Sequence, residues 1–166
     1  MKTDFRLKYP LWMMAFIALL GVFAYGLNSS STKRTTTDTG GSVIVEVGGF
    51  EMLLIFGALL VYLVLLTIFL SQVKKHNSEN PNQKIALWSI RPPEYLEQDE
   101  GMTYITRMAV QKVYTYYTWA LPLFTAIIII LPLSRLTIIY GILLIAFLQY
   151  VIYYREIRKH FKEENE

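Results

Sequence analysis

The 166-residue sequence contains no cysteine and has few charged residues. The absence of cysteine excludes disulfide bridges, thiolate metal sites, thiol catalysis and palmitoylation. Only 17% of the residues are charged, whereas about 25% is usual for a soluble domain. Hydrophobic residues make up 54% of the chain, which excludes an intrinsically disordered protein. A soluble enzyme built around one large core is also disfavoured.

Recognisable catalytic and ligand-binding motifs are also absent. The sequence has no phosphate-binding GxxxxGK[ST] loop, no HExxH zinc motif and no GxSxG nucleophile elbow. The two histidines, His76 and His160, each stand beside a lysine, an arrangement more typical of solvated flanks than of metal ligands. We therefore predict no catalytic residue, no cofactor, no metal and no nucleic-acid partner.

What the sequence does contain is four long apolar blocks, each close to the ~20 residues that a helix needs to cross a bilayer. The blocks are residues 10–27, 50–72, 114–133 and 136–154. They predict an all-α integral membrane protein, a bundle of four transmembrane helices. The first block could instead be a signal peptide cleaved near Ala24-Tyr25-Gly26, although it exceeds the usual ~15-residue limit of such an apolar region.

The basic residues predict the orientation of these helices. If the N-terminus is cytoplasmic, 13 of the 16 Lys and Arg residues fall on the cytoplasmic side, as the positive-inside rule requires. Both termini are then cytoplasmic. The predicted segments between the spans are a cytoplasmic N-terminus (1–9), an extracytoplasmic loop (28–49), a cytoplasmic loop (73–113), a tight outer turn (134–135) and a cytoplasmic tail (155–166).

The extracytoplasmic loop has two readings. Its Thr- and Val-rich segments flank Gly40-Gly41, which predicts a short β-hairpin turning at these glycines. A flexible Ser/Thr linker explains the same composition. In a hairpin, Val43, Val45 and Val47 would share one face.

The cytoplasmic loop is predicted to contain an amphipathic helix. From Met102 to Val113, apolar residues recur at helical spacing, with Arg107 and Gln111 on other faces. Because the segment is tethered to the bilayer at both ends, we expect this helix to lie on the membrane surface and lead into the third span. Its alternative role is a docking face for a partner.

Ionisable residues are scarce inside the predicted spans, which disfavours an ion-coupled transporter. The residues that could line a pathway or an interaction site are Glu51 at the outer edge, Pro122 as a kink in the third span, and Gln149 in the fourth. Glu94 and Glu97 form the start of an acidic patch in the cytoplasmic loop.

These observations predict a small, non-enzymatic accessory or scaffold subunit of a membrane assembly. Its expected partners are the lipid bilayer and either another membrane protein or further copies of the same chain. The alternative is a small oligomeric channel or transporter with Glu51, Pro122 and Gln149 near the path. A membrane enzyme acting on lipid, using Glu94, Glu97, Asp99 or His76, is a third reading. The composition, rich in Ile, Lys and Asn, suggests a bacterial inner (plasma) membrane.

Overall fold

The structure, a computed structural model, describes residues 5–29, 31–37, 40–46, 48–79, 81, 84 and 100–163. Four helices make up most of this part: α1 (Phe5–Ser29), α2 (Gly49–Glu79), α3 (Glu100–Ile130) and α4 (Arg135–Glu163). Each is long and apolar enough to cross a membrane, as the sequence predicts. The chain is therefore a multi-pass membrane protein.

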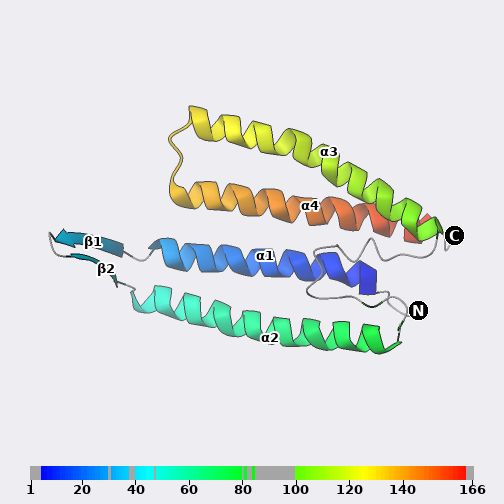
Figure 1. Cartoon of the computed structure of the whole chain (residues 1–166), viewed down its shortest axis with the longest axis horizontal. Helices are drawn as coiled ribbons and strands as arrows, with labels where there is room; N and C mark the ends of the chain where they lie inside the picture. The colour runs from blue at the N-terminus through cyan, green and yellow to red at the C-terminus, as the bar shows by residue number, and fades with distance from the viewer. Residues whose placement is uncertain are drawn as a thin grey trace.

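The helices form a single row instead of a bundle around a common centre. Helix α1 packs against α2 on one side and α4 on the other, and α3 packs against α4. The order across the row is α3, α4, α1, α2, with α3 and α2 at the two edges (Figure 1). A row is stable in lipid because apolar side chains that face hydrocarbon need no protein cover. Both flat faces of the row and both edges are therefore open to the membrane.

Successive helices run in opposite directions. The start of α1 and the end of α4 therefore lie at the same end of the helix axes (Figure 1). The opposite end carries a short antiparallel pair of strands, β1 (Ser31–Thr37) and β2 (Gly40–Glu46). Their register pairs Thr37 with Gly40 and Thr36 with Gly41. Both glycines therefore lie in β2, and the turn predicted at Gly40-Gly41 is wrong in position. Strand β1 ends at Thr37 and β2 already begins at Gly40.

Helix α3 corrects the prediction of a separate helix on the membrane surface. It runs without interruption from Glu100 to Ile130 and so includes the whole predicted 102–113 segment and its junction with the span. Ala109 is fully buried against Tyr153 and Ile157 of α4, with Ile105 and Val113 packed around them. The apolar face expected to lie on lipid therefore packs on α4, which extends to Glu163 and supplies Tyr153 and Ile157 to the contact.

A charged pair joins the first half of α3 to the last turns of α4. Lys112 Nζ lies 2.6 Å from Glu156 Oε2, and the side chain of Glu156 is only 11% exposed. His160 Nδ1 lies 3.0 Å from the carbonyl oxygen of Glu156. Pairing with a cation offsets the cost of burying the carboxylate.

The link between α3 and α4 also differs from the predicted turn at 134–135. It comprises Leu131–Ser134, and Arg135 already belongs to α4. Ser134 is the reason, because its Oγ accepts the backbone N–H of Thr137 at 3.2 Å and its carbonyl accepts that of Ile138 at 3.1 Å. These bonds make Ser134 the N-cap of α4.

Candidate interaction surface

The structure places the predicted site residues on different helices. Glu51 lies in the first turn of α2 and is half-buried. The partial positive charge of the helix N-terminus stabilises its carboxylate there. Pro122 is exposed inside α3, and Gln149 is half-buried in α4. Glu94 and Glu97 lie outside the described residues.

These residues do not form one site within a single chain. Glu51 and Pro122 belong to the two helices at opposite edges of the row (Figure 1). Gln149 instead contacts α3, because its Oε1 accepts a hydrogen bond from the hydroxyl of Tyr117. Gln149 is therefore a link between two neighbouring helices.

A feature that the sequence did not single out is a line of five polar residues and one proline along the outer edge of α3. We call it the outer stripe; it comprises Arg107, Gln111, Thr115, Thr118, Pro122 and Thr125. Spacings of three or four residues keep these side chains on one side of the helix. All six are exposed.

The opposite side of α3 faces α4. Thr106 and Ala109 are buried there, and Val113, Tyr117 and Phe124 are half-buried. The tyrosine hydroxyls on this side bond to α4: Tyr117 donates to Gln149, and Tyr116 donates to the carbonyl oxygen of Ile145 at 3.4 Å. The outer stripe therefore points away from the rest of the chain.

The hydroxyls of the outer stripe bond to their own helix. Thr115 donates to the carbonyl oxygen of Gln111 at 3.0 Å, and Thr118 and Thr125 make the same bond to the carbonyls of Tyr114 and Leu121. Pro122 has no N–H, so the carbonyl oxygen of Thr118 lacks its usual helical donor. The stripe thus presents hydroxyl oxygens, a weakened backbone position and the amide of Gln111 to its surroundings.

The other edge of the row has a different character. The outer side of α2 carries Leu53, Phe56, Leu60 and Val64, which are 67%, 61%, 64% and 50% exposed. Thr67 follows on this side toward the basic end, with its hydroxyl bonded to the carbonyl of Leu63 at 2.8 Å. Apart from this end, the outer side of α2 is apolar, whereas the outer side of α3 carries the outer stripe.

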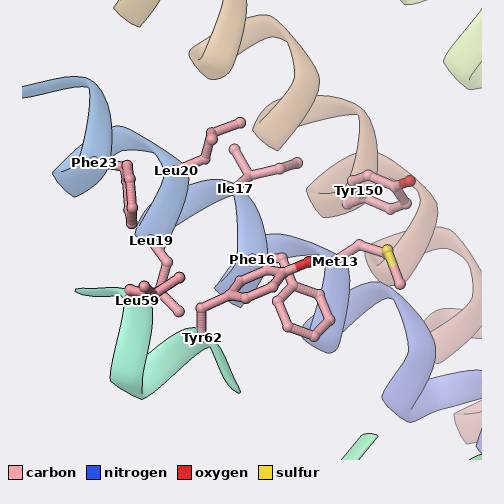
Figure 2. A pocket seen from close by; sticks show the side chains of 9 residues that line it. All are labelled: Met13, Phe16, Ile17, Leu19, Leu20, Phe23, Leu59, Tyr62 and Tyr150. Atoms are coloured by element: carbon pink, nitrogen blue, oxygen red, sulfur yellow. The ribbon is translucent and has the colours of Figure 1, made fainter. Parts of the chain in front are cut away.

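An apolar groove of 440 Å³ lies along α1 on one face of the row. Figure 2 shows its wall, which α1 supplies together with Leu59 and Tyr62 of α2 and Tyr150 of α4. The rings of Phe16 and Tyr62 pack within it, with centroids 5.4 Å apart. Its lining carries no ionisable carboxylate or amine, so the groove has the character of a hydrocarbon surface.

The described residues include no group of three or more His, Asp or Glu side chains placed to hold a metal ion. Comparisons with protein families, with curated proteins and with solved structures found no match. The outer stripe of α3 is therefore the strongest candidate site, and it was detectable in the sequence as polar residues repeating at helical spacing from Arg107 to Thr125.

Proposed function

We propose that this chain is a non-enzymatic membrane protein, an accessory or scaffold subunit that binds another protein within the bilayer. The observation that carries the proposal is the polar outer stripe on the edge helix α3, directed away from the chain's own helices. In membrane proteins, Thr and Gln side chains are enriched where helices meet, because they hydrogen-bond across the contact.

The physical argument depends on what surrounds α3. Polar groups that face hydrocarbon lose their hydrogen bonds to water, and each unsatisfied backbone group costs several kcal/mol. The Thr hydroxyls donate within the helix, but the carbonyl of Thr118, which lacks its helical donor, gains from an external partner. A neighbouring helix supplies such groups, and lipid tails do not.

We further propose that the end of the row with both termini is cytoplasmic and that the membrane is a bacterial plasma membrane. The distribution of 13 of 16 basic residues supports this orientation. The β1–β2 end, with fewer basic residues, is then extracytoplasmic.

Reconstitution of the purified full-length chain tests the proposed function. Liposomes loaded with a small fluorescent dye or with K⁺ are expected to retain their contents as well as protein-free liposomes do. Release that depends on the protein would refute a purely interacting role. A known channel reconstituted in parallel provides the positive control.

One observation favours a second function, an oligomeric channel. The hydroxyl oxygens of Thr115, Thr118 and Thr125 lie on one side of α3 and could line a water-filled path between several copies. This reading requires protein-dependent flux in the same assay. It also predicts that Glu51→Gln changes that flux.

A further inference from the structure

We infer that the apolar groove along α1 holds one acyl chain of an anionic phospholipid, and that Arg158 binds the phosphate of the same lipid. The groove is a different surface from the outer stripe, so the inference does not rest on the proposed function. The length and width of the groove support it, as do the side chains and the charge at one of its ends.

The groove has the length of one lipid leaflet. Its wall on α1 runs from Met13 to Phe23, which is about 15 Å at the helical rise of 1.5 Å per residue. One leaflet contributes about half of the roughly 30 Å of hydrocarbon in a bilayer. Met13 follows Trp12, a residue type enriched at the level of the headgroups. The groove therefore extends from just below the headgroups toward the middle of the bilayer.

The width of the groove admits an acyl chain but not a helix. Over its length, a volume of 440 Å³ corresponds to a cross-section of about 30 Å². An α-helix with its side chains is about 10–12 Å across, which is about three times this area. Leu59 and Tyr62 of α2 close one side of the groove, and Tyr150 of α4 lies on the other (Figure 2). The bilayer itself supplies the flexible hydrocarbon chain that fits between them.

Aromatic and basic side chains continue from the groove toward water along α4. Tyr150 lines the groove, and Tyr154 and Arg158 follow at intervals of four residues, a spacing that keeps them on one side of the helix. The guanidinium carbon of Arg158 lies 6.0 Å from the centre of the Tyr154 ring. Since helical side chains tilt toward the N-terminus of their helix, this guanidinium is level with Tyr154, about 6 Å beyond Tyr150.

The charge at this end of the groove fits an anionic headgroup. Arg158 is exposed, and in the described part of the chain it contacts the ring of Tyr154 and no carboxylate. Arg155 is exposed on the same helical turn. Glu156, the carboxylate on this stretch of α4, is paired with Lys112 of α3. Basic residues beside transmembrane helices attract anionic lipids, each strengthening the binding about fivefold.

Native mass spectrometry of the purified full-length chain tests the choice of headgroup. The chain is incubated in mild detergent with an equimolar mixture of phosphatidylglycerol and phosphatidylcholine that carry the same acyl chains. We expect it to retain one phosphatidylglycerol in preference to phosphatidylcholine. Equal retention of the two lipids would overturn the inference.

Charge variants locate the headgroup. Arg158→Gln should weaken retention of phosphatidylglycerol about fivefold and leave that of phosphatidylcholine unchanged. Arg135→Gln is the matched control, because it removes the same charge from an exposed position at the opposite end of α4. It should leave the retention of both lipids unchanged. Equal losses in the two variants would contradict a site at Arg158.

A second pair of variants tests the groove itself. Leu20 is an exposed residue of its lining, so Leu20→Trp places an indole where the acyl chain would lie. This variant should retain less phosphatidylglycerol than the original sequence. Leu60→Trp adds the same ring to the exposed outer edge of α2 and should have no effect. Unchanged retention in Leu20→Trp would place the lipid elsewhere and refute the inference.

Photo-cross-linking in membranes identifies the occupant without purification. A benzophenone-bearing residue introduced at Leu20 should form an adduct with the mass of a phospholipid. An adduct with a second protein would mean that a protein segment occupies the groove, and the inference would fail. Flux in the liposome assay refutes the proposed function without changing these results, so the two proposals fail separately.

Discussion

Each of the three helix contacts in the row contains a hydrogen bond donated by an aromatic side chain. Trp12 Nε1 donates to Gln72 Oε1 at 3.1 Å between α1 and α2, and Tyr140 donates to the carbonyl of Gly21 at 3.0 Å between α4 and α1. Tyr117 and Gln149 make the corresponding bond between α3 and α4. In lipid, where burial of apolar surface does not drive helices together, such bonds and close packing determine which helices are neighbours.

The bond between Trp12 and Gln72 leads to a prediction at the scale of single residues. Trp12→Phe removes the donor but keeps an aromatic ring against Phe69, whose centroid lies 5.9 Å from that of Trp12. We expect the free energy of unfolding in detergent to fall by about 1 kcal/mol, the usual range for interhelical hydrogen bonds in membranes. Unfolding by SDS titration measures the change.

A double-mutant cycle with Gln72→Leu provides the control. If the bond is present, the two substitutions together destabilise the chain by less than the sum of their separate effects. Strict additivity would show that Trp12 acts through packing alone.

At the scale of the elements, close approach of α3 and α4 depends on Gly141. A methyl group added there would lie 2.2 Å from the ring of Phe124 on α3. Gly57 on the exposed side of α2, by contrast, has no side chain or neighbouring backbone within 4 Å of the same added atom. The two glycines therefore form a matched pair, one at a contact and one in an open position.

We predict that Gly141→Ala destabilises the chain by about 1–3 kcal/mol, because the ring of Phe124 or the helix must move. Gly57→Ala should be neutral or stabilise α2 by up to about 1 kcal/mol, since alanine is the better helix former. Thermal unfolding in the same detergent compares the variants. Phe124→Leu should restore part of the stability lost in Gly141→Ala; equal losses in both glycine variants would contradict the contact.

The sequence was a good guide to the spans and a poor guide to how they meet. Long apolar blocks predict helices in lipid directly, and all four are present. The pattern around Ile105 and Ala109 could not distinguish a lipid surface from the flank of α4, because both offer apolar contact. The row also escaped prediction, since the uncharged apolar stretch 52–66 of α2 does not reveal which of its sides faces protein.

The candidate site was only partly predictable for a similar reason. Pro122 and Thr125 were recognisable as unusual inside a span. They share one side of α3 with Gln111, and that side is identified as the outer one only because α4 covers the opposite side. Glu51 and Gln149 stood out as polar residues among apolar ones. Their roles come instead from a helix terminus and from a bond to Tyr117.

At the scale of the whole molecule, the two ends of the helix axes differ in their content of basic residues. Helix α2 ends in a stretch with Lys74 and Lys75, and α4 ends in one with Arg155, Arg158 and Lys159, all at the end where the termini lie (Figure 1). The end with β1 and β2 follows Asn28 of α1.

This difference predicts the labelling of intact cells that produce the chain. A membrane-impermeant thiol reagent should modify Asn28→Cys from outside, and should modify Lys75→Cys only after the cells are permeabilised. Both positions are exposed and lie in the last turns of their helices, so access to the reagent depends on the side of the membrane. Labelling of Lys75→Cys in intact cells would reverse the proposed orientation.

Helix α3 has 31 residues and is therefore about 46 Å long, which exceeds the roughly 30 Å of hydrocarbon. Its first turns extend past the lipid and share one continuous backbone with the outer stripe as far as Pro122. Between Tyr104 and Thr118 the helix is held to α4 by the packing of Ala109 and the Lys112–Glu156 pair. The part of α3 outside the lipid and the part within it therefore move as one helix up to Pro122.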